Sequence, residues 1–275
     1  MTGILYIVAT PIGNLNDMTA RAIDTLKSVD VIACEDTRTS SKLLSFFNIS
    51  TPTTAYHEYN ADTQTARLVE RLQGGQSVAL ISDAGTPLIS DPGYRLVKAC
   101  HDESITVMPI VGACAVIGAL SVAGLPSDKF SFVGFLPAKQ HGRIEALKAY
   151  QAHGETLIFY EAPHRIVDCL ADMADVFGGE REATLCREIS KTFETIKKLP
   201  LADLLEFVKN DPNQQRGEIV LVVAGNTQKE QKADYDEWLL AIAKELPPKK
   251  ASAIVADVLG IKKSAVYDRL LELSK

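Results

Sequence analysis

The sequence contains no apolar run as long as a membrane-spanning helix, which needs about 20 residues, although 46% of its 275 residues are apolar. It has no basic region followed by an apolar core and a cleavage site, so we expect a cytoplasmic protein without an export signal. Its five cysteines are an odd number and never form a Cys-x-x-Cys pair. This pattern predicts free thiols in a reducing compartment and no metal site.

Two common nucleotide-binding fingerprints are also missing. The chain has neither a Gly-x-Gly-x-x-Gly turn nor a Gly-x-x-x-x-Gly-Lys-Ser/Thr loop, which argues against a nicotinamide dinucleotide or a nucleoside triphosphate as ligand. It has instead a twelve-residue block, SDAGTPLISDPG at 82–93, directly after the apolar run 78–81. An apolar run that ends in Gly, Pro and Asp predicts a strand followed by a shaped loop.

Strand-like runs alternate with helical patterns through the first 110 residues, which predicts a parallel α/β sheet. An apolar segment at 112–124 is expected to form a buried helix, and 126–128 resembles a domain junction. The strand-like runs lie at 4–10, 29–35, 53–58, 78–83 and 105–110, and two of the helical patterns lie at 19–28 and 63–73.

The second half predicts a mixed sheet, because two of its strand-like runs flank Ser190–Thr192 closely enough to form a hairpin. Residues 226–233 are polar and typical of a linker, and the rest is helical. We therefore expect two α/β domains, 1–124 and 125–228, with a cleft between them, and a small helical tail, 234–275. The runs of the second half lie at 130–135, 156–160, 183–189, 194–199 and 218–223.

The loops after the first five strand-like runs carry polar and glycine-rich sequences. Because the carboxyl ends of parallel strands meet at one edge of a sheet, these loops should line one ligand-binding crevice. Gly112 would let the backbone come close to a ligand, and the amides of the following helix suit a carboxylate or a ribose.

Six motifs occur in a fixed order: ATPIGN (9–14), EDTR (35–38), the block at 82–93, GFLP (134–137), FYEAPHR (159–165) and REISKTFE (187–194). Together they resemble the bacterial small-subunit ribosomal RNA 2′-O-methyltransferases of the tetrapyrrole-methylase superfamily. The resemblance implies a two-domain enzyme, usually a homodimer, that binds S-adenosylmethionine in the cleft between its domains. Its implied substrate is the ribose of a cytidine in the decoding region of the small ribosomal subunit.

The resemblance also implies a set of cofactor-binding residues. The sequence departs from the family pattern at Val111, where proline is usual, and at Tyr59, where many members have a second histidine. The implied cofactor residues are Pro11, Asp83, Thr86, Cys114, Ala115, Tyr160 and Cys186.

Methyl transfer to a ribose hydroxyl calls for a base that takes the hydroxyl proton, and Glu35, Asp36 and His57 are candidates on the expected edge. Arg38, Arg165 and Lys191 are candidates for holding RNA phosphates. Simpler interpretations remain open. Glu35 and Arg38 could pair to order a loop, His57 could be structural, and Cys114 could be a packing residue.

The last 29 residues, from 247 to 275, hold six basic and three acidic residues in a chain whose net charge is −6. Gly260 is expected to end one helix and Ser264 to lie near the start of the next, as in a helix–turn–helix. Lys249, Lys250, Lys262 and Lys263 make this tail a candidate RNA-binding unit. A solvated helical hairpin packed on the body is the alternative.

Two rival functions remain open from the sequence. A methylase that acts on a tetrapyrrole, such as a corrin precursor, would have the same two-domain architecture. A non-catalytic RNA-binding module on a methylase fold would have the same basic tail. The basic tail and the EDTR loop favour an RNA methyltransferase over the tetrapyrrole enzyme.

Overall fold

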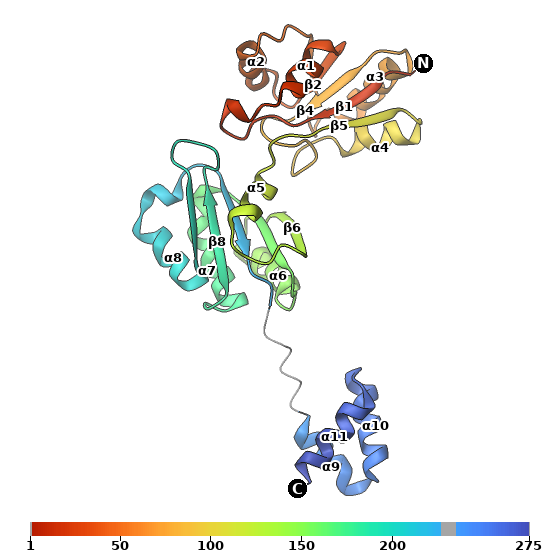
Figure 1. Ribbon diagram of the computed structural model, residues 1–275, viewed down its shortest axis with the longest axis vertical. Coiled ribbons are helices and arrows are strands. Elements are labelled where there is room, and N and C mark those ends of the chain that lie inside the picture. Colours follow the sequence, from red (N-terminus) through yellow and green to blue (C-terminus); the bar gives the residue numbers. More distant parts are fainter. Residues whose placement is uncertain (1, 227–234, 275) are drawn as a thin grey trace. The chain divides into compact units, whose positions relative to one another are not determined.

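The computed structural model describes residues 2–226 and 235–274, which fall into two compact units. Met1–Gly225 forms the first unit and contains two five-stranded sheets, and the second unit is the helical tail (Figure 1). In the described residues no helix is long and apolar enough to cross a membrane. The domain boundary predicted at 124/125 lies between the two sheets and stays a prediction, and all but the first residue of the predicted linker 226–233 lies outside the described residues.

The first sheet is entirely parallel, as predicted, with strand order β3-β2-β4-β1-β5. Apolar residues on its two faces form separate cores, because helices cover both sides. Leu5 and Leu80 pack with α3 and α4, whereas Val8 and Ile81 pack with α1 and α2. The strands are β1 (Ile4–Val8), β2 (Val31–Cys34), β3 (Thr53–Ala55), β4 (Val78–Ile81) and β5 (Thr106–Ile110). The helices are α1 (Ala20–Ser28), α2 (Thr37–Phe46), α3 (Ala61–Gln73) and α4 (Tyr94–Asp102).

The second sheet is mixed, as predicted, with order β6-β7-β10-β8-β9. β6 and β7 are parallel, the other neighbours are antiparallel, and β8 and β9 form the predicted hairpin. One face packs on three helices around Phe159, Leu170 and Leu204. The strands are β6 (Phe130–Phe135), β7 (Thr156–Glu161), β8 (Glu182–Arg187), β9 (Thr195–Pro200) and β10 (Ile219–Val223). The helices are α6 (Gln140–Tyr150), α7 (Ile166–Phe177) and α8 (Leu201–Asn210).

Helix α5 (Ala115–Val122) covers the other face of the second sheet. The expectation of a buried helix over 112–124 is wrong in two respects. The helix begins only at Ala115, and Ile117 and Val122 are 53% and 51% exposed. Val116 and Ala119 face the sheet. The exposed side of the helix could not be predicted, because the segment is apolar on all sides and has no polar stripe.

The tail is a three-helix unit with its own apolar core around Leu239, Val255 and Val266. Gly260 ends α10 in the left-handed conformation (φ 64°), as predicted, because glycine adopts it without a Cβ clash. The Arg269 guanidinium pairs with Asp236 at 2.5 Å and so joins the last helix of the tail to the first helix of the tail. The helices are α9 (Asp236–Glu245), α10 (Pro248–Leu259) and α11 (Lys263–Leu273).

Candidate functional site

A cavity of about 430 Å³ lies where loops of the two sheets meet. The parallel sheet contributes the loops after β1, β4 and β5, which share its carboxyl edge. The mixed sheet contributes the ends of β6 and β7, Ile189 two residues beyond β8, and the start of β10. The lining residues are Ile12, Asp83–Thr86, Ile89–Asp91, Cys114, Ala115, Phe135, Tyr160–Pro163, Ile189 and Gly217–Val220.

The SDAGTPLISDPG block is fixed to the loop after β1 by backbone pairing. Thr10 and Gly85 form an isolated antiparallel bridge, and the Thr10 hydroxyl also donates to the carbonyl of Ser82 at 3.3 Å. Gly85 has φ 83°, a left-handed conformation that glycine adopts without steric cost. The two loops therefore form one wall of the cavity.

The loop after β5 is held against the same block. The Thr86 hydroxyl donates to the carbonyl of Ala113 at 2.9 Å. A Cβ at Gly112 would lie 3.0 Å from the Cβ of Ala9. Gly112 therefore allows this loop to approach the end of β1. The close neighbour of Gly112 is Ala9, where the sequence predicted a ligand.

Carboxyl groups gather at the carboxyl edge. Burial raises the pKa of Glu35, and the charges of Asp91, Asp83 and Asp36 raise it further. Burial also raises the pKa of Asp91, which a hydrogen bond with Ser82 partly offsets and the charge of Asp83 reinforces. Glu35 and Asp91 therefore hold a proton to higher pH than ordinary carboxyl groups.

Two aromatic rings from the second sheet, Phe135 and Tyr160, also line the cavity. The Tyr160 ring makes edge contacts with Phe132 and Phe135, at centroid distances of 4.9 and 5.5 Å. Burial raises the pKa of Tyr160, and nearby negative charges add to the effect, so its hydroxyl stays protonated at neutral pH. These rings are apolar, and Tyr160 adds a hydroxyl donor near Glu161 and Glu218, which also line the cavity.

Five of the seven residues implied for the cofactor lie on the cavity: Asp83, Thr86, Cys114, Ala115 and Tyr160. Pro11 and Cys186 are not among its described lining residues. Pro11 is buried, and its neighbour Ile12 lines the cavity instead. Cys186 lies beneath α5, where burial raises the pKa of its thiol to about 12. The binding roles of all seven stay predictions.

The three candidate bases lie outside the cavity lining. Asp36 caps the N-terminus of α2 by accepting from the amide of Arg38 at 2.8 Å. Hydrogen bonds from Arg38 lower its pKa to about 2, which makes it a poor proton acceptor. Arg38 thus pairs with Asp36, at 2.9 Å, and not with Glu35. The Asp36 amide also donates to the Asp83 carboxylate at 3.2 Å, so this loop contacts the cavity wall.

His57 lies after β3, next to the loop that holds Glu35, because β2 and β3 are paired. Its amide donates to Asn60 Oδ1 at 2.9 Å. Its Nδ1 is buried and has no hydrogen-bond partner among the described residues. Its ring makes an edge contact with Tyr59, which is 99% exposed.

The residues predicted to bind RNA fall into two groups, those paired within the protein and those exposed. Arg165 is bonded to buried Glu161 at 2.9 Å, and Lys191 to Glu188 and Glu218 at 2.7 and 2.9 Å, so both are occupied within the protein. Arg38 pairs with Asp36 but its side chain is 90% exposed. The four tail lysines are exposed, and in the described part of the tail none forms an ion pair. These are Lys249, Lys250, Lys262 and Lys263.

The sequence did not predict several residues that line the cavity, because their residue types do not indicate a ligand-binding role. Ile89 and Phe135 lie within recognised motifs, but nothing in their residue type marks them as facing a cavity. Gly217 and Glu218 lie outside every motif, at the start of β10. The pairing of β10 with β7 and β8 brings them to the site, and the sequence does not encode that pairing locally.

The two sheets and the cavity between their loops define the class to which the chain belongs. Residues 4–205 match the family of tetrapyrrole (corrin/porphyrin) methylases. Two solved structures share the fold. A uroporphyrin-III-C-methyltransferase from Thermus thermophilus has a TM-score of 0.57 at 19% identity and covers 81% of this chain and 94% of its own. A diphthine synthase has a TM-score of 0.64 at 16% identity, with 82% and 91% coverage.

Within this class, the chain belongs to the ribosomal RNA small subunit methyltransferase I family. It is 53% identical to the Pseudomonas aeruginosa member over 98% of this chain and 97% of that one. It is 54% identical to the Vibrio cholerae member, with 98% and 94% coverage. Residues 229–274 match the RsmI C-terminal HTH domain, in accord with the helical tail. Among the described residues, no group of three or more His, Cys, Asp or Glu side chains forms a metal-binding cluster.

Proposed function

We propose that this protein transfers a methyl group from S-adenosylmethionine to small-subunit ribosomal RNA. The finer proposal is that the acceptor is the 2′-oxygen of a cytidine ribose in the decoding region. The observation that carries the proposal is the likeness, at about half of all positions over nearly the whole chain, to proteins named ribosomal RNA small subunit methyltransferase I. Five of the six motifs contribute residues to the cavity lining, and the EDTR loop contacts it through the hydrogen bond from the Asp36 amide to Asp83.

The cavity suits S-adenosylmethionine in size and in chemistry. Its volume of about 430 Å³ is within the range of small-molecule sites. Ile89, Phe135 and Ile189 offer apolar surface to an adenine ring, and the exposed Asp83 carboxylate can accept from a ribose hydroxyl or an ammonium group. Cys114 and Ala115 offer the amides of a helix N-terminus to a carboxylate.

When bound, the cofactor supplies an electrophilic methyl group on a sulfonium. The protein must hold the acceptor ribose in line with that group, and such positioning supplies a large part of catalysis. We assign the role of base to Glu35 in preference to Asp36. Its raised pKa makes it the stronger proton acceptor, whereas the Asp36 carboxylate is held by Arg38. Glu35 would take the proton of the 2′-hydroxyl as the oxygen–methyl bond forms and the sulfur–methyl bond breaks, its electron pair staying on the sulfur.

Glu35→Gln tests this assignment, since the amide keeps the size of the side chain and cannot accept the proton. Turnover should fall about 100-fold, the lower range for loss of a general base, while S-adenosylmethionine affinity stays close to the wild-type value. Asp36→Asn and His57→Ala serve as comparisons under single-turnover conditions. If Glu35→Gln turns over as fast as the wild type, the base is a different group.

Two measurements test the function itself. Isothermal titration calorimetry with S-adenosylmethionine should show one saturable site, and a protein without affinity for it would be a non-catalytic module. Tritium from a labelled methyl group should enter small-subunit ribosomal RNA and not a porphyrinoid, whereas the reverse result would make the protein a tetrapyrrole methylase.

We further propose that the protein acts in the cytoplasm as a homodimer, and that its basic tail holds RNA. The four exposed tail lysines can neutralise phosphates. Sedimentation equilibrium tests the dimer, and a monomer at micromolar concentration would contradict it.

A further inference from the structure

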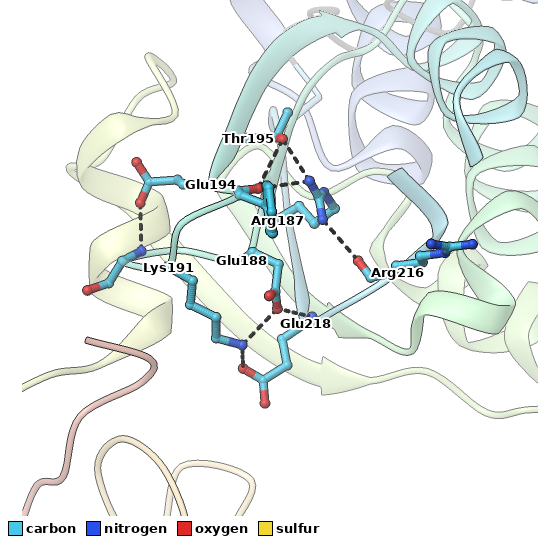
Figure 2. Close-up of polar contacts among 9 residues, drawn as sticks. Arg187, Glu188, Lys191, Glu194, Thr195, Arg216 and Glu218 are labelled. Carbon is cyan, nitrogen blue, oxygen red and sulfur yellow. Dashed lines mark hydrogen bonds and ion pairs between the residues drawn. The ribbon is translucent and has the colours of Figure 1, made fainter. Parts of the chain in front are cut away.

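Glu188 directly follows β8, and its backbone has a conformation that side chains rarely adopt. Its φ is 53°, in the left-handed region that favours glycine. Its amide donates to the carbonyl of Glu218 at 2.9 Å, and its carbonyl accepts from the amide of Lys191 at 3.0 Å. The unusual turn therefore directs the Glu188 side chain toward the start of β10 (Figure 2).

The Glu188 carboxylate makes two polar contacts there. Oε1 accepts from the amide of Glu218 at 2.9 Å and from Lys191 Nζ at 2.7 Å, and Lys191 Nζ also pairs with Glu218 at 2.9 Å. Burial acts to raise the pKa of Glu188, but the hydrogen bonds from Lys191 and the Glu218 amide outweigh it and lower the pKa. The group is therefore a charged acceptor that ties the turn after β8 to the start of β10.

Gly217 leaves the space that the Glu188 carboxylate fills. A Cβ at Gly217 would lie 2.4 Å from both Cδ and Oε1 of Glu188, a distance that van der Waals repulsion forbids, and φ at Gly217 is 78°. The glycine and the glutamate therefore fit each other. Because Gly217–Val220 lines the cavity, the Glu188 carboxylate supports one cavity wall from behind.

The same network reaches the first sheet's loops. The Lys191 side chain lies so close to Gly13 that a Cβ there would be 2.3 Å from its Cγ. The neighbouring Ser190 hydroxyl hydrogen-bonds the carboxylate of Asp17. Gly13 and Asp17 follow β1, in or just beyond the loop that contributes Ile12 to the cavity. The tip of the β8–β9 hairpin thus connects the two sides of the cavity.

We propose that Glu188 is a positioning residue for the cofactor: it sets the backbone at Gly217 and Glu218 and, through Lys191, holds this wall against the loop after β1. The inference rests on the proposed function, in that S-adenosylmethionine is the ligand of this cavity. It gives Lys191 a role within the protein in place of an RNA phosphate contact.

Glu188→Ala removes both hydrogen bonds to the carboxylate. We expect the Kd for S-adenosylmethionine, measured by calorimetry, to rise about tenfold, as for the loss of a charge-assisted hydrogen bond. Glu188→Gln keeps an oxygen that can accept from the Glu218 amide but loses the charge that pairs with Lys191. Its Kd should therefore lie between those of the wild type and Glu188→Ala. Glu206→Ala is the matched control. Glu206 forms an ion pair of the same i,i+3 spacing with Lys209 on α8, away from the cavity, and its Kd should change by less than about twofold.

A double-mutant cycle separates positioning from a general loss of structure. Gly217→Ala displaces the carboxylate, so it should weaken cofactor binding in the wild-type background and add little in the Glu188→Ala background. Additive effects on Kd would overturn the proposal. If Glu188→Ala does not fold, the comparison of Glu188→Gln with the wild type decides alone, and equal affinities would again overturn it.

Lys191→Met provides an independent arm with RNA as ligand. The proposal predicts a weaker cofactor complex and an unchanged dependence of RNA affinity on salt. A salt slope smaller by about one, the value for a lost phosphate contact, with unchanged cofactor affinity would contradict it. A wild-type protein that does not bind S-adenosylmethionine would instead refute the proposed function, so the two failures are distinct.

Discussion

Thr10 and Gly85 exchange two backbone hydrogen bonds: the Thr10 amide donates to the Gly85 carbonyl at 2.8 Å, and the Gly85 amide donates to the Thr10 carbonyl at 3.0 Å. They join two loops of the parallel sheet that are 75 positions apart in the sequence. Gly85 lines the cavity in a left-handed conformation. The wall that carries Asp83 and Thr86 is therefore held by backbone contacts.

Gly85→Ala should weaken this wall. The alanine would have to adopt φ 83°, and its Cβ would lie 3.3 Å from Cγ2 of Ile12, which also lines the cavity. We expect a loss of stability of about 1 kcal/mol and a Kd for S-adenosylmethionine about tenfold higher, measured by thermal unfolding and calorimetry.

Gly178→Ala is the matched control for this change. Gly178 has φ 93° and no heavy atom within 4 Å of the position of an added Cβ, and it follows α7, away from the cavity. It should lose similar stability with unchanged cofactor affinity. Equal cofactor affinity in both variants would show that the Thr10–Gly85 bridge does not shape the binding site.

Glu35→Gln should make the protein more stable at neutral pH. Burial and neighbouring carboxylates raise the folded-state pKa of Glu35 above 4.5, the ordinary value of a glutamate. Ionisation then favours the unfolded state, so this residue's effect on stability is absent below about pH 4.5 and becomes unfavourable as the pH rises through the folded-state pKa. The variant should therefore have a higher Tm than the wild type at pH 7 and an equal Tm near pH 4. A lower Tm at pH 7 would show that the carboxylate is stabilised in the folded state.

Tyr59 is expected to contact RNA. The residue is 99% exposed, in the loop beside the one that holds Arg38, and nucleobases stack on exposed aromatic rings. In steady-state methylation, Tyr59→Ala should raise the KM for RNA about tenfold, within the range for a lost stacking contact, whereas Tyr59→Phe should keep the wild-type KM. Cofactor affinity should be the same in all three proteins. A wild-type KM in Tyr59→Ala would rule out a stacking role.

Deletion of the tail after residue 233 should separate RNA binding from cofactor binding. The tail has its own core, and Met1–Gly225 is a compact unit without it, so the truncated chain should fold. RNA affinity should fall and depend less on salt, because the four tail lysines are removed, while the Kd for S-adenosylmethionine stays the same. Unchanged RNA affinity would mean that the tail has another role.

The parts of the fold that could be predicted are those with local signals. The alternation of short apolar runs with amphipathic helices predicted the parallel sheet. The proximity of two runs around Ser190–Thr192 predicted the β8–β9 hairpin. Gly260 predicted the end of a tail helix because glycine, having no Cβ, adopts a positive φ more readily than other residues.

The parts that could not be predicted depend on contacts between distant segments. Cys186 lies within the predicted strand-like run 183–189, yet its thiol is buried beneath α5 and is not among the described lining residues of the cavity. Lys191 pairs with Glu188 in its own turn, and it reaches a second carboxylate because β10 brings Glu218 beside it. The backbone conformation of Glu188 carries no sequence signal, since glutamate has no preference for positive φ.

The most direct test of the proposed function is to map ribose methylation in small-subunit ribosomal RNA from cells with and without this gene. Nuclease digestion followed by mass spectrometry identifies each 2′-O-methylated nucleotide. We expect one cytidine of the decoding region to lose its 2′-O-methyl group in the deletion strain and to regain it when the wild-type gene is restored. Identical methylation in the two strains would contradict the proposed function.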